Sequence, residues 1–124
     1  MTFVSNYKNL EVYILSRSLA SNIFLLTKKF PKEEMYSLTD QIRRSSRSVG
    51  AQIAESWAKR RYEKHFISKL TDADAEIMET QHWIEIAFDL KLISEEELTK
   101  VLNDCASINR MLNSIINKSS QFCK

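Results

Sequence analysis

The sequence contains a single glycine, Gly50, and a single proline, Pro31, among 124 residues. β-Sheet proteins draw on glycine and proline for their turns, and phosphate-binding loops need several glycines close together. One residue of each type therefore excludes an all-β fold and any glycine-rich phosphate loop. The chain must build its structure, and any functional surface, from helices.

The length fits one domain, because domains commonly contain about 100–150 residues. With 44% hydrophobic and 27% charged residues, the composition matches an ordered globular domain. No apolar run approaches the roughly 20 residues of a membrane-spanning helix, and no secretory signal is evident at the N-terminus. Two cysteines, Cys105 and Cys123, are too few for a disulfide scaffold. We therefore expect a cytoplasmic protein with no membrane partner.

Apolar residues recur at spacings of three and four along four segments, which predicts four amphipathic helices over residues 7–29, 33–60, 63–90 and 95–121. Pro31 ends the first segment, and the acids that follow it predict a fresh helix start. Ser94 with Glu97 three residues later predicts a capping box at the fourth helix. Long helices with short connections predict an all-α fold, an antiparallel up-down-up-down four-helix bundle forming a single domain over residues 1–124.

The inward face of each helix follows from its apolar stripe. The residues expected in the core are Val12, Leu15, Leu19, Ile23, Leu26 and Phe30, then Leu38, Ile42, Ser46, Val49, Ile53 and Trp57, then Phe66, Leu70, Ala73, Ile77, Ile84 and Phe88, and finally Leu98, Val101, Leu102, Cys105, Ile108, Leu112, Ile115 and Ile116. A glycine inside a helix costs about 1 kcal/mol relative to alanine. We therefore expect Gly50, in a serine- and alanine-rich helix, to permit close approach by another backbone.

Further apolar residues lie outside these stripes, and bands of exposed apolar residues mark interfaces. On the first and third helices the band comprises Leu10, Tyr13, Ile14, Phe24, Leu25, Trp83 and Ile86. This surplus predicts a homo-oligomer.

The charge is distributed unevenly along the chain. Residues 1–71 carry 13 basic and 6 acidic side chains, whereas residues 72–104 carry 2 basic and 10 acidic ones. Such asymmetry favours either a polyanionic partner or a face that neutralises another face.

Two kinds of catalytic site can be tested on the sequence. Glu79 and His82 form one Glu-x-x-His pair, but a ferritin-like di-iron site needs two such pairs, and the fourth helix contains no histidine. Cys105 lies on an apolar face, as a buried free cysteine commonly does, and no nucleophile, base and orienting group come together. We expect no enzymatic activity, no metal and no cofactor.

Two basic clusters remain. Arg43, Arg44 and Arg47 form a stripe that can contact phosphate or pair with the acidic line Asp72, Glu76 and Glu79, within the chain or across subunits; we favour pairing. The second cluster lies where the second helix meets the third, with Trp57 and Tyr62 interleaved, and comprises Lys59, Arg60, Arg61 and Lys64. Cations beside aromatic rings suit phosphate contact with base stacking. Basic residues at a helix end also complement its dipole, so both readings stay open for this cluster.

Several motifs, taken in order, resemble a known family. They are Tyr7–Val12, Phe30–Glu34, Leu38–Ser46, Gln52–Ser56, Phe66–Ile67 and Glu76–Thr80. Together they resemble the small bacterial four-helix bundle proteins encoded in intervening sequences of large-subunit ribosomal RNA genes, sometimes labelled S23. The resemblance implies a non-enzymatic homopentamer with no established biochemical activity. Its distant relatives include accessory proteins of diversity-generating retroelements, basic pentamers that bind a reverse transcriptase and nucleic acid.

The sequence departs from the family pattern in places. Ser45 and Ser46 stand where Ala-Ala is usual, Gln52 and Ser56 replace an Asn and a Gly, and Asp74-Ala75 lies near a usual Gly-Ser. These departures bear on pentamer geometry rather than on the fold. The resulting hypothesis is a homo-oligomeric, pentameric scaffold that binds RNA or DNA, as accessory to a nucleic-acid enzyme such as a reverse transcriptase. The alternative is a protein–protein adaptor whose arginines serve oligomer assembly.

Overall fold

The structure, a computed structural model, describes residues 5–123. Within this range the chain forms four α-helices and no strand: α1 (Glu11–Thr27), α2 (Leu38–Ala58), α3 (Glu63–Asp89) and α4 (Glu95–Asn117). Three 3-10 turns, η1 (Tyr7–Asn9), η2 (Lys32–Glu34) and η3 (Ser119–Gln121), flank them. The predicted all-α fold with four helices is confirmed.

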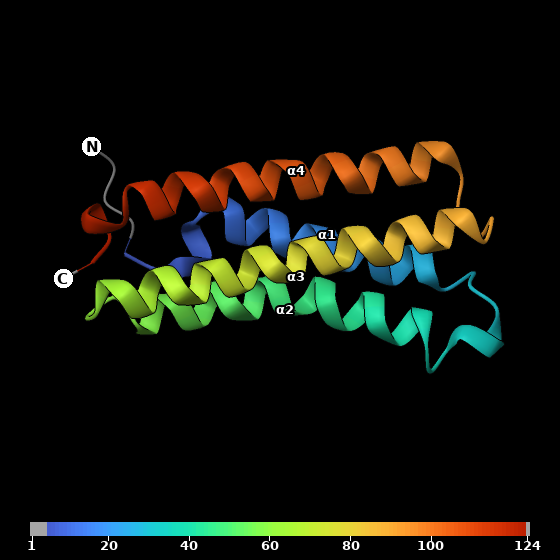
Figure 1. Ribbon diagram of the computed structural model, residues 1–124, viewed down its shortest axis with the longest axis horizontal. Coiled ribbons are helices and arrows are strands. Elements are labelled where there is room, and N and C mark those ends of the chain that lie inside the picture. The colour runs from blue at the N-terminus through green and yellow to red at the C-terminus, as the bar shows by residue number, and fades with distance from the viewer. Residues whose placement is uncertain (1–4, 124) are drawn as a thin grey trace.

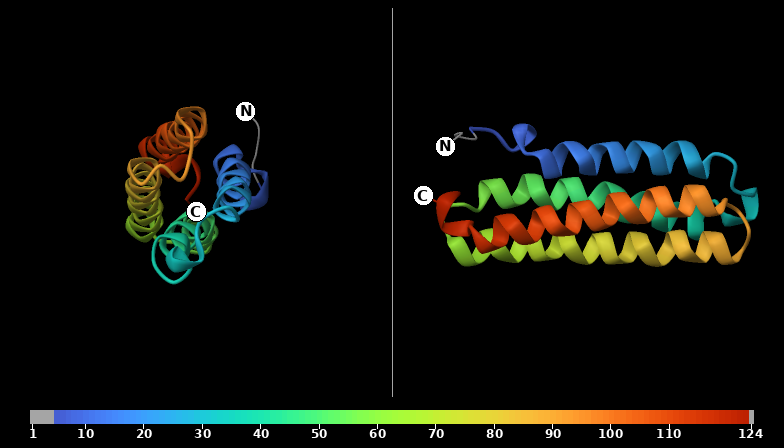
Figure 2. Two further views of the ribbon diagram at one scale, coloured as in Figure 1. Left: turned by 90° about the vertical axis from the view of Figure 1, so that its right-hand side faces the viewer. Right: turned by 90° about the horizontal axis from the view of Figure 1, so that it is seen from above.

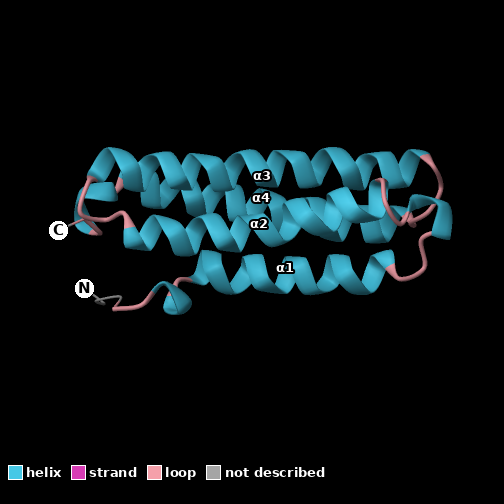
Figure 3. Ribbon diagram, turned by 90° about the horizontal axis from the view of Figure 1, so that it is seen from below, coloured by secondary structure: helices cyan, strands magenta, loops and turns pink. Residues whose placement is uncertain are grey.

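The four helices run side by side along the long axis, and the chain reverses direction at each connection (Figure 1). Seen end-on, they surround a common core (Figure 2). Each helix contacts the next one in sequence, and α1 closes the bundle against α4; α2 and α3 make the most extensive contact. The connections lie at the two ends of the bundle (Figure 3). No helix within residues 5–123 is both long and apolar enough to cross a bilayer.

Three predicted helix boundaries are wrong. The first helix begins at Glu11 rather than at residue 7, because Leu10 is extended between η1 and α1. The second begins at Leu38 rather than at residue 33, since Glu34 accepts hydrogen bonds from the Ser37 hydroxyl (2.7 Å) and the Leu38 N–H (3.3 Å) and closes a turn there. The fourth ends at Asn117, after which η3 turns the chain across the end of the bundle.

Most of the predicted core is confirmed. Ile23, Ile42, Ile77 and Ile108 are fully buried, and the Ser94–Glu97 capping box is present in both directions. Phe88 is an error: it is 38% exposed, and the neighbouring Ala87 is buried instead. Over the 27 residues of α3, the inward face drifts relative to a fixed spacing.

The serines of α2 pack tightly against neighbouring helices. Ser45, Ser46 and Ser56 are buried, and their hydroxyls donate to carbonyls of their own helix. Ser45 also lies 2.9 Å from the Thr80 hydroxyl, which joins α2 to α3. A Cβ built on Gly50 would lie 3.1 Å from Oγ of Ser16 on α1. The atoms nearest this glycine belong to the side chains of Ser16 and Tyr13, so the predicted close approach of another backbone is wrong: Gly50 makes room for a side chain.

Candidate nucleic-acid interface

The second basic cluster occupies the connection between α2 and α3, and we call Lys59, Arg60, Arg61 and Lys64 the basic corner. Backbone hydrogen bonds hold this connection: Lys59 N–H donates to Ser56 (2.9 Å), and Tyr62 N–H donates to Lys59 (3.0 Å). The corner lies at the same end of the bundle as η1 and η3 (Figure 1). It is therefore a short turn closed by backbone hydrogen bonds.

Arg60 is anchored on Trp57. Its guanidinium carbon lies 3.8 Å from the centre of the indole ring, and its Nε donates to the Trp57 carbonyl at 2.9 Å. The ring of Phe122 packs edge-on against the same indole at 6.4 Å. Trp57 is thus engaged within the protein and packs against the core, as its place on the apolar stripe predicts, and it is not an open stacking surface. The terminal Nη groups of Arg60 have no acceptor among residues 5–123.

The basic corner carries an unneutralised positive charge. Across the described chain, no carboxylate lies within 4.0 Å of any of its four cations. The one acid inside the cluster, Glu63, accepts a hydrogen bond from the Ser119 hydroxyl of η3. No side chain caps the start of α3, whose dipole adds partial positive charge there. The C-terminus of α2 lies in the same connection and its dipole opposes that of α3, so the positive charge of the corner comes from its side chains, four cations against the single acid Glu63.

The three arginines of the predicted stripe, Arg43, Arg44 and Arg47, have different partners in the structure. Arg44 pairs with Glu79 at 2.9 Å, which confirms the predicted ion pairing for this residue. Arg43 instead donates to the Thr27 hydroxyl (2.8 Å), and its guanidinium lies 4.8 Å from the ring centre of Phe24. Arg47 also faces the Phe24 ring, at 5.8 Å. The prediction that Arg43 and Arg47 pair with the acidic line within the chain is therefore wrong.

The rest of the acidic line has other surroundings. Asp72 lies 3.9 Å from Lys69, which itself pairs with Glu55 at 2.6 Å. Glu76 has no ion pair among residues 5–123. Among residues 5–123, only Glu79 therefore connects the predicted acidic and basic stripes.

The predicted interface residues separate into three groups: exposed, buried and half-buried. Ile14 (56%), Phe24 (37%) and Leu25 (62%) are exposed on α1. Leu10 is only 7% exposed and belongs to the core, so its predicted position on an exposed band is wrong; the extended backbone before α1 turns it inward. Trp83 and Ile86 are half-buried and pack against the core.

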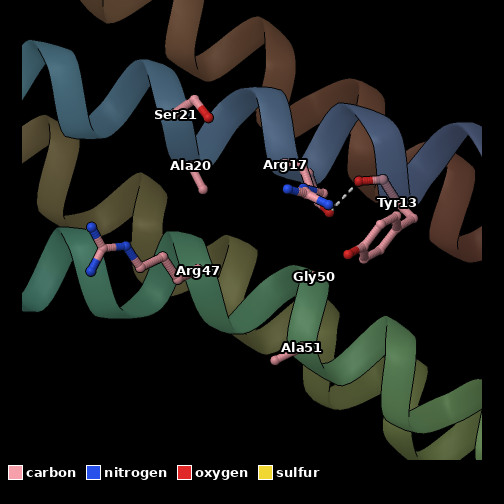
Figure 4. A pocket seen from close by; sticks show the side chains of 8 residues that line it. Tyr13, Arg17, Ala20, Ser21, Arg47, Gly50 and Ala51 are labelled. Carbon is pink, nitrogen blue, oxygen red and sulfur yellow. Dashed lines mark hydrogen bonds between the residues drawn. The ribbon is translucent and has the colours of Figure 1, made fainter. Parts of the chain in front are cut away.

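A groove of about 260 Å³ follows the line between α1 and α2. Tyr13 and Arg17 project from α1 on one side and Arg47 from α2 on the other, with Gly50 and Ala51 forming part of its wall (Figure 4). The small residues keep the two helices close and leave this face hollowed. Together with exposed Phe24 and Leu25, the groove forms an apolar face with cationic margins.

The residues considered for catalysis have structural partners. Glu79 accepts from Arg44 and from Trp83 Nε1 (3.3 Å), and His82 packs on the Trp83 ring at 4.7 Å. Between residues 5 and 123, no three His, Cys, Asp or Glu side chains are grouped so that they could hold a metal ion. Burial raises the pKa of the Cys105 thiol to about 12, which keeps it protonated.

The structure also reveals two sets of aromatic contacts that the sequence did not indicate. Phe122 supports Trp57 and stacks on Phe66 at 6.2 Å. Phe24 gathers three cations around one exposed ring, with Lys28 at 4.9 Å as the third. Phe122 stands in a polar tail, and no periodicity links it to Trp57, which lies 65 positions earlier in the chain.

These observations define a small all-helical bundle protein whose most distinctive surface is a positively charged corner. Residues 8–114 match the family described as 23S rRNA-intervening sequence protein, and the chain belongs to this family. It is similar to a crystal structure of a protein of unknown function from the S23 ribosomal protein family of Bacteroides thetaiotaomicron. The two are 33% identical with a TM-score of 0.76, over 86% of this chain and 95% of the other. No curated protein matches the chain.

Proposed function

We propose that the protein is a non-enzymatic, homo-oligomeric scaffold that binds RNA or DNA through the basic corner. The observation that carries this proposal is the set of four cations without a carboxylate partner, one of them held on an indole ring with its Nη groups free. Guanidinium and ammonium groups in such a position bind phosphate oxygens and release counterions. The resemblance to basic retroelement accessory proteins supports a role beside a nucleic-acid enzyme such as a reverse transcriptase.

The oligomeric part of the proposal rests on the α1 face. Ile14 and Leu25 are more than half exposed on α1, and Leu25 lines a second hollow that shares Ala20, Ser21 and Arg47 with the groove between α1 and α2. Exposed apolar side chains on a helix that lines a groove are typical of protein–protein contact. A ring, pentameric as the family resemblance implies, would repeat the basic corner around its axis, so that several weak phosphate contacts act together.

The test is light scattering on a size-exclusion column, with and without a structured RNA, over a salt series. Four phosphate contacts per corner predict a slope of log affinity against log salt of about −3 for single strands, and a steeper one where several corners act on one RNA. The variant Arg60→Glu/Arg61→Glu should abolish binding without dissociating the oligomer. A matched control is Lys32→Glu/Lys91→Glu, which makes the same change in net charge at the opposite end of the bundle. RNA binding that survives the first variant would contradict the assignment of the corner.

The second candidate is a protein–protein adaptor without nucleic-acid binding. The internal partners of Arg43 and Arg44 favour it, because these arginines stabilise helix contacts rather than present free charge. Docking through the apolar α1 face should change little with salt, whereas phosphate binding weakens steeply. An oligomer that takes up no RNA even at low salt would favour the adaptor.

A further inference from the structure

We propose that the basic corner selects unpaired nucleotides, with one base stacked on the ring of Tyr62, over duplex RNA or DNA. This inference rests on the proposed function and assigns the class of nucleic acid. Its basis is the difference between two aromatic rings of the corner: Trp57 is covered, whereas Tyr62 is 58% exposed.

Tyr62 presents its ring from a fixed backbone position. It is the residue just before α3, with an extended backbone (φ −124°, ψ 107°), and its carbonyl accepts the N–H groups of His65 and Phe66 at 3.0 Å each. The side chain makes no capping hydrogen bond. The exposed His65 ring lies 5.5 Å from it, at an angle of 52°. An exposed aromatic pair at the start of α3 is therefore open to a ligand, and nucleobases stack on Tyr and His rings.

The cations surround this ring. Lys59, Arg61 and Lys64 lie within three residues of Tyr62, are exposed, and have no carboxylate partner in the described chain. Arg60 is fixed on Trp57 through its ring contact and its Nε, which leaves both Nη groups for phosphate. A strand that places a base on Tyr62 would keep its flanking phosphates within reach of these groups. The corner thus combines a stacking surface with backbone contacts, as single-strand binding sites do.

A duplex does not fit this arrangement. Its base faces are covered by neighbouring base pairs, so that a protruding tyrosine ring could reach them only by unstacking a base step. Proteins that recognise duplex RNA by shape contact two successive minor grooves over about 16 base pairs. The basic corner comprises four side chains on one turn of the chain, which is too small to span that distance. Unpaired nucleotides in a loop or at an end satisfy both the stacking and the phosphate contacts.

The test compares short probes that occupy one corner at a time. An eight-nucleotide single strand containing 2-aminopurine reports stacking by loss of its fluorescence, and a labelled eight-base-pair duplex stable at the assay temperature reports phosphate contact alone. Tyr62→Leu should weaken single-strand binding about 5- to 100-fold and remove the quenching, while Tyr62→Phe retains both. Tyr36→Leu is the matched control, because Tyr36 is 91% exposed at the opposite end of the bundle. Duplex affinity should be the same in all four proteins.

Each outcome decides the question. Tighter binding of the single strand, with quenching that depends on an aromatic residue at position 62, supports the inference. Equal affinity for strand and duplex, or quenching unchanged in Tyr62→Leu, overturns it. If binding in that case still weakens with salt and is abolished by Arg60→Glu/Arg61→Glu, the proposed nucleic-acid function stands and only the stacking role is refuted. If neither probe binds at low salt, the proposed function fails together with the inference.

Discussion

The contact between Gly50 and Ser16 sets how closely α1 and α2 pack, and it yields a quantitative prediction. Replacing a glycine inside a helix with alanine gains about 1 kcal/mol of helix stability. The new Cβ, however, would lie 3.1 Å from the Ser16 Oγ, closer than an ordinary van der Waals contact. The ring of Tyr13 lies at 3.6 Å and does not obstruct it. The sign of the net effect therefore depends on the Ser16 hydroxyl.

That hydroxyl is held in place. Ser16 is 1% exposed, and its Oγ donates to the Tyr13 carbonyl at 2.7 Å. Rotating it away would lose a hydrogen bond worth about 1 kcal/mol, which offsets the gain in helix stability. We expect Gly50→Ala to change the free energy of unfolding by less than about 0.5 kcal/mol. In a Ser16→Ala background the same change should stabilise by about 1 kcal/mol, or about 4 °C in Tm.

The assay is urea unfolding of the four proteins of this double-mutant cycle, at one protein concentration because assembly shifts apparent stability. The coupling free energy between positions 16 and 50 should be about 1 kcal/mol. A coupling of zero would refute the reasoning, since it would show that the hydroxyl does not limit the approach of the helices. A loss above about 2 kcal/mol in both backgrounds would also refute it, because overpacking of that size points to the backbone.

Three further predictions concern single side chains. A hydrogen bond from Lys29, and after it one from the Ser94 N–H, lowers the pKa of Glu97. The stability that the Glu97 carboxylate adds to the fold is therefore complete above about pH 4.5 and is lost as the pH falls through the lowered pKa. Glu97→Gln should flatten this part of the plot of stability against pH, by at most about 1 kcal/mol. Native protein at pH 8 should alkylate at half-buried Cys123 and not at Cys105, and both thiols should react in urea. Phe122→Ala should cost about 2 kcal/mol and shift the Trp57 fluorescence, because Phe122 is half-buried against Trp57.

Each of these three predictions has an outcome that would contradict it. An unchanged acid profile in Glu97→Gln would show that the ion pair with Lys29 does not form in solution. Alkylation of Cys105 in the native state at the rate of Cys123, followed by mass spectrometry, would show that the core opens. Unaltered Trp57 fluorescence in Phe122→Ala would show that the C-terminal segment does not cover the indole.

Local pattern was sufficient to predict the helices and most of their buried faces. Spacing of apolar residues identified Ile23, Ile42, Ile77 and Ile108 as core, because a helix repeats its face regardless of what it packs against. The Ser94–Glu97 capping box was likewise predictable, since both partners lie within one turn. The start of α2 was not, because the side chain of Glu34 closes a turn that proline and acidic residues alone do not specify.

In the candidate site, too, some features follow from the local sequence and others do not. The sequence by itself determined that Lys59, Arg60, Arg61 and Lys64 form one cluster, because neighbours in a short connection between helices remain neighbours in space. Only the tertiary structure decided which groups of that cluster are free. Trp57 is covered through Phe122, which is distant in sequence, and Tyr62 is left open. Likewise, the rotation of α2 between α1 and α3 directs Arg44 to Glu79 and Arg43 to Phe24, although the two arginines are adjacent. Contacts between helices depend on their relative rotation and on segments far apart in the chain, and periodicity within one helix contains neither.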